Sequence, residues 1–210
     1  MYLSKIVLEL RHPSVRQALK DANDMHRNLM AGFKMYDGCL TPRADLNVLY
    51  RLMETRDQIY LLVSSTIKPD AEALKLHGYN TDETMIRDLS PLHSVLVDGK
   101  YLRFELLASP CKKTGIDGSK RRVFLEKQEE RLEWLRRKGK NGGFDVTVAD
   151  EISGRVDVCG RRSGTEIINS AVLFSGVLRI TDSETFWQSY TCGIGPGKAY
   201  GLGLLTLARA

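Results

Sequence analysis

The alternation of apolar and polar residues predicts a strand at the start of each half of the chain. In residues 2–10, YLSKIVLEL, the side chains of Ile6, Leu8 and Leu10 fall on one face of an extended chain. Residues 100–108, which contain YLRFELLA, show a second strand pattern later in the chain. The repetition indicates that the second half restarts the plan of the first.

Helical patterns follow both of these strands. In the first half, a helix is predicted near residues 24–33, and weaker helical signals lie between residues 70 and 89. In the second half, residues 125–137 carry apolar side chains at helical spacing, and glycines end the pattern. A capping box, TDSE at residues 181–184, opens a last helix that runs through Tyr190.

The remaining strands follow from apolar runs bounded by turn residues. These are residues 46–53, 58–64, 144–148, 156–158, 167–180 and 202–207. The fourth strand of the first half has no clear pattern. The resulting order, β-α-β-β-α-β twice, predicts an α+β fold of two tandem ferredoxin-like (RRM-like) domains. Turn residues place the boundary between residues 90 and 99, which gives domains of residues 1–95 and 96–210.

Length and composition suit one large domain or two small ones. The chain has 210 residues, of which 42% are hydrophobic, enough for packed cores. It has no apolar run of membrane-spanning length and does not begin with a signal-peptide pattern, so we expect no membrane association. Its four cysteines are far apart and lack zinc-ligand spacing. Reduced thiols in a cytoplasmic protein, and no metal or other cofactor, are therefore expected.

The excess positive charge lies in one part of the chain. The net charge is +5, and residues 111–162 hold fourteen Lys or Arg against nine Asp or Glu, which accounts for all of it. The excess forms three runs, at residues 112–122, 136–140 and 155–162. A single such run is as often plain solvated surface as a binding site. Three runs so close together fit a polyanion better, because each neutralised phosphate releases counterions.

A glycine-rich loop, GIGPGKAYGLG at residues 193–203, precedes the last apolar run. A nucleotide cradle is one interpretation, because the backbone N–H groups of such loops approach phosphates. The glycine spacing matches neither the dinucleotide fingerprint nor the P-loop. The favoured interpretation is a turn that feeds the last strand, with Lys198 as a candidate phosphate ligand.

Several segments together resemble the CasE family, the CRISPR-associated endoribonucleases of the type I-E Cascade system. They are MYLSKIVLEL, MHR at residues 25–27, LRFELLASPCK, EKQEERLEWL, AVLFSGVLRI and GIGPGKAYGLGLLTLA, in an order that spans nearly the whole chain. The resemblance implies two tandem ferredoxin-like domains and metal-independent cleavage of CRISPR precursor RNA at the base of each repeat hairpin. It also implies products with a 2′,3′-cyclic phosphate and a 5′-hydroxyl, and an enzyme that stays on its product RNA as a Cascade subunit.

Metal-free RNA cleavage needs a base for the 2′-OH, an acid for the leaving 5′-oxygen and positive charge near the phosphorane. Of the four histidines, only His26 falls in a segment of the resemblance. It lies at the edge of the apolar stripe of Met25, Leu29 and Phe33. From the pattern alone, a half-buried structural histidine is the commoner interpretation; the resemblance makes His26 the expected general base or acid. If Asn23 caps the helix, the helix dipole favours neutral His26.

Asn23 and Arg27 are the other residues expected at the catalytic site. At the position of Asn23 the family has a tyrosine that contacts the reacting groups, so the catalytic partner of His26 stays open. Asn23 can orient a 2′-OH but cannot transfer a proton. Arg27 or Lys34 is expected to stabilise the phosphorane, and plain helix surface is the commoner interpretation for Lys34.

For RNA binding, the segments CKKTGIDGSKRR and VCGRRSG occupy the positions of the family's basic loop and hairpin. The narrow major groove of an A-form stem favours phosphate contacts along the stem and base contacts near its foot. The residues expected to contact RNA are Lys112, Lys113, Lys120, Arg121, Arg122, Arg161, Arg162 and Lys198.

Two alternatives from other classes remain. One is a catalytically weak or inactive subunit that only binds hairpin RNA, although the aromatic signature of RNA-binding strands is absent from LRFELLA. The other is a small-molecule or metal enzyme on the same fold, although potential ligand residues are not clustered in the sequence. Cleavage of RNA separates the first alternative from the expected activity, and metal dependence separates the second.

Overall fold

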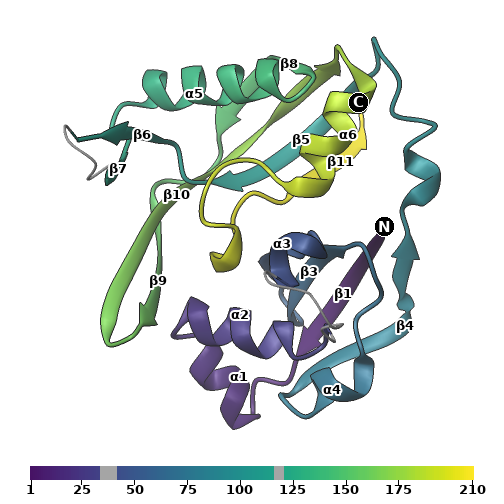
Figure 1. Ribbon diagram of the computed structural model, residues 1–210, viewed down its shortest axis with the longest axis vertical. Helices are drawn as coiled ribbons and strands as arrows, with labels where there is room; N and C mark the ends of the chain where they lie inside the picture. The colour runs from purple at the N-terminus through teal and green to yellow at the C-terminus, as the bar shows by residue number, and fades with distance from the viewer. Residues whose placement is uncertain (34–41, 116–120) are drawn as a thin grey trace.

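The computed structural model describes residues 1–33, 42–115 and 121–210, and its main body consists of two antiparallel sheets with helices packed on them (Figure 1). The strands of the first sheet are β1 (Tyr2–Leu8), β2 (Leu49–Glu54), β3 (Ile59–Ser65) and β4 (Tyr79–Asp88). The helices of this half are α1 (Pro13–Ala18), α2 (Ala22–Met30), α3 (Pro42–Asp45) and α4 (Ala71–Lys75), followed by a 3-10 turn η1 (Ser90–Leu92). The strand order is β2-β3-β1-β4.

The first core lies between this sheet and the helices α1, α2 and α4. Ile6 of β1 and Leu61 of β3 are fully buried on the helix-facing side of the sheet. Met25 and Leu29 of α2 pack into the same core. Phe33, which follows the end of α2, is buried there as well. The apolar stripe predicted for this segment is thus confirmed, although the helix ends before its last member.

The second half repeats the plan with two insertions. Its strands are β5 (Tyr101–Ala108), β6 (Cys111–Thr114), β7 (Arg121–Phe124), β8 (Phe144–Glu151), β9 (Val156–Arg162), β10 (Thr165–Ile180) and β11 (Leu205–Arg209). Its helices are α5 (Gln128–Asn141) and α6 (Ser183–Cys192), with a 3-10 turn η2 (Lys198–Tyr200). The main sheet has the order β11-β5-β10-β8.

The two sheets share one topology. In each, the first strand of the half lies between the last strand and the third main strand, and the described neighbours are antiparallel. This is the strand arrangement of a ferredoxin-like unit. The expectation of two tandem ferredoxin-like domains is therefore confirmed.

The fourth strand of the first half, β4, is the element that the sequence pattern concealed. Residues 79–88 read YNTDETMIRD, and they pair with β1 at an edge of the sheet. An edge strand tolerates polar and charged residues, which also discourage pairing with other chains. The helical signals expected between residues 70 and 89 are correct only for α4, which Asp70 caps.

Two insertions project from the second sheet (Figure 1). The segment expected as a basic loop forms a separate two-stranded ribbon, β6–β7. The other insertion is a hairpin: β9 pairs with residues 165–171 of β10, while the rest of β10 runs through the main sheet. The hairpin extends away from its own sheet toward α1 and α2. Ser163 and Gly164, both with positive φ, form its turn, where the tip was expected.

The helices of the second half are amphipathic. In α5, Trp134 and Leu135 are buried in the second core, while the opposite face is rich in Lys, Arg and Glu. In α6, the N-cap is Asp182, whose carboxylate accepts a hydrogen bond from the backbone N–H of Thr185. The predicted capping box therefore begins one residue too early. Within the described residues, no helix is both long and apolar enough to cross a membrane.

An ion pair joins the two sheets. Arg51 of β2 and Glu105 of β5 approach to 3.0 Å between Nη1 and Oε2, and the arginine side chain is only 8% exposed. The guanidinium is buried, whereas the carboxylate of Glu105 is 42% exposed, so solvent screens part of the attraction. The pair therefore favours one relative arrangement of the two sheets.

Candidate functional site

Helix α2 begins with a cap from the residue before it. The carboxylate of Asp21 accepts a hydrogen bond from the backbone N–H of Asn23, with 2.9 Å between the nitrogen and Oδ1. The N-cap of α2 is therefore Asp21, and the helix is not capped by Asn23. A carboxylate at this position offsets the positive end of the helix dipole and satisfies one free N–H group. His26 consequently lies beyond the first turn, where the dipole has less effect on it.

His26 lies half-buried on α2, at the edge of the helix face that packs into the core. Burial lowers its pKa from the usual 6.5, and the positive charge of Arg43 lowers it further. The Nδ1 atom is buried without a hydrogen-bond partner in the described parts of the chain. The Tyr50 ring lies nearly parallel to the imidazole, at 14° and 6.5 Å between centroids. The environment thus favours neutral His26.

Two cationic side chains belong to elements close to this histidine. Arg43 belongs to α3, and Lys198 begins η2 in the glycine-rich loop. Burial lowers the pKa of Lys198, and the positive charges of Arg43 and Lys138 also lower it. The charge of Arg43 lowers the pKa of both His26 and Lys198, and α2 contacts η2, so the three groups belong to the same junction. Among the described residues, neither Arg43 nor Lys198 has a carboxylate partner within ion-pair distance, so the cluster is suited to an anion.

The glycine-rich loop packs closely against the first sheet, because its glycines have no side chains to keep it away. At Gly201, with φ of +78°, a Cβ atom would lie 3.1 Å from the ring of Tyr50, and at Gly193 one would lie 2.8 Å from Leu49. The hydroxyl of Tyr50 donates a hydrogen bond to the carbonyl oxygen of Ala199, 2.9 Å away. The loop therefore does more than turn the chain, because it holds Lys198 beside α2 and β2.

The hairpin also contacts the start of α2. The backbone N–H of Arg161 in β9 donates to both carboxylate oxygens of Asp21, at 3.1 and 3.2 Å. Gly160 is buried, and a Cβ atom there would lie 2.8 Å from Cε1 of Tyr200 and 3.2 Å from the backbone nitrogen of Asn23. Two segments of the second half, the glycine-rich loop and the hairpin, therefore both contact α2.

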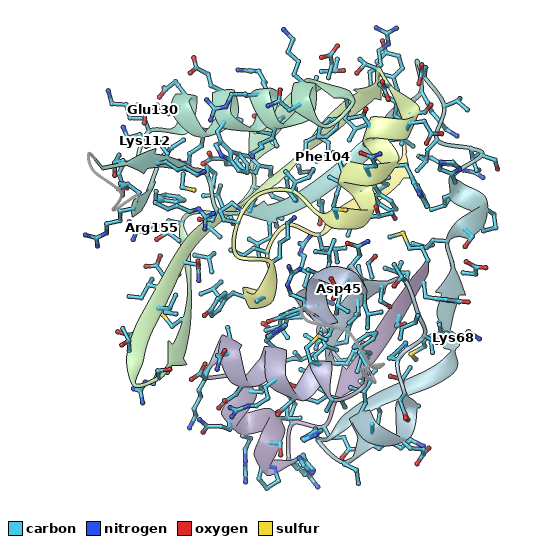
Figure 2. All side chains as sticks on the ribbon, viewed as in Figure 1. Asp45, Lys68, Phe104, Lys112, Glu130 and Arg155 are labelled. Atoms are coloured by element: carbon cyan, nitrogen blue, oxygen red, sulfur yellow. The ribbon has the colours of Figure 1, made fainter. Side chains whose placement is uncertain are left out.

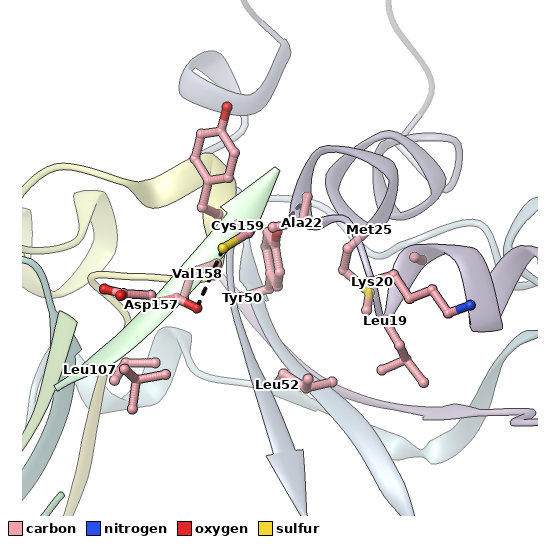
Figure 3. Close-up of a pocket in the computed structure, with 14 residues that line it drawn as sticks. Leu19, Lys20, Ala22, Met25, Tyr50, Leu52, Leu107, Asp157, Val158 and Cys159 are labelled. Carbon is pink, nitrogen blue, oxygen red and sulfur yellow. Dashed lines mark hydrogen bonds between the residues drawn. The ribbon is translucent and has the colours of Figure 1, made fainter. Parts of the chain in front are cut away.

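A cavity of about 380 Å³ lies beside this junction (Figure 3). Its walls come from α1, α2, β2, β9 and the glycine-rich loop, and most of the lining is apolar. Leu52 and Leu107 line one end, and the carboxylate of Asp157 and the amine of Lys20 lie at its polar margins. Neither His26 nor Lys198 lines the cavity, so it is separate from the cation cluster.

In the basic ribbon β6–β7, positive charges on the two strands lie opposite one another. Lys113 lies directly opposite Arg122, and both are exposed. Lys112 and Arg121, also exposed, lie on the other face of the ribbon. Like charges directly opposite one another destabilise a strand pair. A bound polyanion relieves this repulsion, which suits the ribbon to binding one.

Comparison of the chain with known proteins identifies its family. The sequence matches the family described as CRISPR associated protein over residues 1–209. The chain belongs to this family. It is 31% identical to the CRISPR-associated endoribonuclease Cse3 of Thermus thermophilus, with 99% of this chain and 100% of that protein covered. It is 30% identical to the CRISPR system Cascade subunit CasE of Escherichia coli, with 99% of both chains covered.

A solved structure agrees with the sequence matches. The structure of Thermus thermophilus Cse3 bound to an RNA representing a pre-cleavage complex superimposes with a TM-score of 0.83. The sequence identity is 28%, and the match covers 99% of this chain and 98% of that one. The expectation that the chain is a CasE relative of the CRISPR-associated protein family is therefore confirmed.

In this member of the CRISPR-associated protein family, the residues expected at the catalytic site only partly converge. His26, Asn23 and Lys198 meet at the junction, and the backbone of Arg161 reaches it through Asp21. Arg27 instead is exposed and pairs with Asp24 on the same helix.

Apart from Lys198, the described residues expected to bind RNA lie on two separate projections (Figure 2). The label of Lys112 marks the ribbon, and that of Arg155 lies near the start of the hairpin. Arg155 pairs with Asp157 and Glu126, so its charge is partly neutralised. Lys34 and Lys120 fall outside the described residues, as does the side chain of Arg162.

The structure adds residues that no sequence pattern indicates. Arg43 lies in a segment without a motif, and Tyr50 looked like an ordinary strand residue. Asp21 precedes the helix by the right spacing for a cap, but its contact with Arg161 depends on how the two halves pack. In the described part of the chain, no group of three or more His, Cys, Asp or Glu side chains is arranged to hold a metal ion.

Proposed function

We propose that this protein is an endoribonuclease that cleaves CRISPR precursor RNA at the base of a repeat hairpin and stays bound to the product as a Cascade subunit. Family membership supports the proposal, since one relative is an endoribonuclease and another a Cascade subunit. The observation that carries it is the convergence of His26, Arg43 and Lys198. These groups provide a base and positive charge, which transesterification of RNA needs.

In the proposed reaction, the RNA 2′-oxygen attacks the adjacent phosphorus as its proton passes to His26. The bond from phosphorus to the 5′-oxygen breaks, which leaves a 2′,3′-cyclic phosphate and a 5′-hydroxyl. The lowered pKa supports the role of base, because a neutral imidazole is ready to accept the proton near neutral pH. We therefore assign His26 as base rather than acid.

Lys198 and Arg43 complete the proposed site. Arg43 stabilises the negative charge of the phosphorane. Lys198 donates a proton to the leaving 5′-oxygen, a role supported by its lowered pKa, which makes the ammonium a stronger acid. Asn23 lies on the same helix as His26 and, as expected from the sequence, orients the 2′-OH. A catalytic role for Arg27 stays a prediction, and the pairing of its guanidinium with Asp24 argues against that role.

RNA binding is assigned to the two basic projections and the glycine-rich loop. Lys112, Lys113, Lys120, Arg121 and Arg122 belong to the segment of the ribbon. Arg161 and Arg162 lie near the tip of the hairpin, and Lys198 lies at the junction. The exposure of the described side chains on the ribbon and of Arg161 supports contacts with phosphates. The hairpin's contact with α2 supports a path for the RNA that ends at His26.

We also propose a division into domains of residues 1–95 and 96–210 and a cytoplasmic location. The two sheets with their separate cores support the division, which falls between β4 and β5. Cys111, Cys159 and Cys192 are free thiols, which fits a reducing compartment.

The test is cleavage of end-labelled repeat RNA from the CRISPR array that accompanies the gene. Wild type, His26→Ala and a control, Tyr101→Phe in an exposed position, are compared in excess chelator. One substrate carries a single 2′-deoxy nucleotide at the cleavage position. We expect cleavage by wild type and the control, none by His26→Ala, and none of the 2′-deoxy RNA.

A second candidate is a hairpin-binding subunit without activity. The observation that favours it is Asn23, whose amide cannot transfer a proton where the resemblance places a tyrosine. Tight binding of the repeat RNA by wild type without cleavage supports this candidate. Cleavage that stops in chelator contradicts the metal-free reaction.

A further inference from the structure

Asp21 makes contacts with both halves of the chain. Its carboxylate caps α2 through the backbone N–H of Asn23 and also accepts the backbone N–H of Arg161 in β9. Capping alone requires one oxygen atom, as serine and threonine caps show. The second contact therefore links the helix that carries His26 to the hairpin.

The contact lies where β9 packs against the first half of the chain. From residue 156 to residue 161, Gly160 is the buried residue, and the others are exposed or half-exposed. The missing side chain lets the strand approach, because a Cβ atom on Gly160 would lie 3.2 Å from both Oδ1 of Asp21 and the backbone nitrogen of Asn23. A two-stranded hairpin outside its sheet has little stability of its own. Contacts with the first half, among them the one with Asp21, therefore help to fix its position.

We propose that Asp21 is a positioning residue that couples the RNA-binding hairpin to the helix bearing His26. This rests on the proposed function, in which Arg161 contacts RNA and His26 accepts the 2′-OH proton. When RNA phosphates bind the side chain of Arg161, its backbone N–H is fixed as well. Through the hydrogen bond to Asp21, this also fixes the start of α2. The base then sits at a fixed distance from the bound RNA only while the carboxylate joins the two segments.

Asp21→Ser separates this role from capping. Serine is a good N-cap residue, so α2 keeps its cap, but its single short hydroxyl cannot also hold the hairpin N–H. The matched control is Asp182→Ser, which makes the same change at the cap of α6. Gly160→Ala disturbs the same contact from the side of the hairpin and leaves Asp21 intact. Its added carbon would lie 2.8 Å from Cε1 of Tyr200, so the strand must shift away from α2.

The first measurement is single-turnover cleavage of the repeat RNA, with the rate at saturating protein separated from the dissociation constant. We expect Asp21→Ser and Gly160→Ala to lose about tenfold to a hundredfold in the saturated rate, the effect of a slightly misplaced catalytic group. Their melting temperatures and dissociation constants should match those of Asp182→Ser. An unchanged rate in both variants, or a loss in binding alone, overturns the proposal.

The second measurement does not depend on cleavage. Hydrogen–deuterium exchange of the α2 peptide is followed with and without repeat RNA that carries the 2′-deoxy block. In wild type and Asp182→Ser, we expect bound RNA to slow exchange in α2, and in Asp21→Ser we expect no slowing although RNA binds. Equal slowing in all three proteins overturns the coupling. A wild type that shows the slowing but does not cleave contradicts the proposed function alone.

Discussion

The hydroxyl of Tyr50 donates a hydrogen bond to the carbonyl oxygen of Ala199, and so joins β2 of the first half to the glycine-rich loop of the second. Burial, with smaller effects from Tyr79 and Tyr200, raises the pKa of Tyr50 well above its usual value, so the hydroxyl remains a donor at any physiological pH. The same ring lies parallel to His26. One buried side chain thus holds the backbone next to Lys198 in place beside the proposed base.

Tyr50→Phe tests this relationship, because it keeps the ring and removes only the hydroxyl. We expect the free energy of unfolding to fall by about 1 kcal/mol, the usual net value of a buried hydrogen bond. We also expect slower cleavage at saturating protein, because η2 loses its attachment to β2. Urea unfolding and single-turnover kinetics measure the two effects. Tyr101→Phe, at an exposed position, is the control, and equal rates for both variants would show that the bond does not position Lys198.

The pKa of His26 predicts the pH dependence of cleavage. Since burial and the charge of Arg43 lower this pKa below 6.5, His26 should stay neutral and active as a base in mildly acidic solution. The acid limb of the rate at subsaturating protein, which reports the free enzyme, should therefore have its midpoint below 6.5. A midpoint at or above 6.5 would contradict a buried neutral base.

The same shift predicts a pH dependence of stability. Below its usual pKa of 6.5, His26 takes up a proton more readily in the unfolded chain than in the folded protein. The folded state therefore loses stability as the pH falls through and below 6.5. Urea unfolding of wild type and His26→Gln at pH 7.5 and pH 5, about one unit above and about one and a half units below the usual pKa, should show a smaller loss in the variant. An equal loss would place the titration elsewhere.

Arg43 and Arg27 are predicted to differ in catalysis. Arg43→Ala removes a charge that acts on both His26 and Lys198, so the cleavage rate should fall by more than about tenfold, or about 1.4 kcal/mol. Arg27→Ala removes an exposed side chain that pairs with Asp24, and its rate should fall by less than that. Single-turnover rates decide between them. The reverse order would restore Arg27 to the mechanism.

The sequence was sufficient for the fold but not for the whole site. Strands such as β1 and β5 have one buried face, so their apolar alternation predicts them directly. The edge strand β4 is polar because half of its surroundings is solvent, and the pattern that identifies strands was lost there. His26 was found through a local motif and the edge of a helix stripe.

Asp21 and Tyr50 act through contacts between segments far apart in the chain, and Arg43 acts through its charge on Lys198. Asp21 meets a backbone N–H that is 140 positions away, and Tyr50 meets a carbonyl 149 positions away. Backbone groups carry no side-chain identity, so no pattern of residue types marks such a partner in advance. These residues require the packed structure, whereas a cap or an apolar stripe is decided within a few neighbouring residues.

The last prediction concerns a buried ion pair that supports the basic ribbon. Arg131 of α5 binds Glu151 of β8 through two parallel hydrogen bonds of 2.7 Å, and Glu151 is only 7% exposed. Arg131 also donates to the carbonyl oxygens of Leu125 and Glu126, directly after β7. One arginine therefore fixes the end of the ribbon to the second core.

Arg131→Ala should destabilise the protein by about 3 kcal/mol or more, because the carboxylate of Glu151 would be left buried without a partner. The double variant Arg131→Met with Glu151→Met should recover most of that loss, since no buried charge remains. Its ribbon should still be less well fixed, because the bonds to Leu125 and Glu126 are gone. Urea unfolding measures the first effect. The dependence of RNA binding on salt measures the second: its slope should become shallower in the double variant by roughly one to two units, as ribbon cations lose phosphates. An unchanged slope would mean that the ribbon does not bind the RNA.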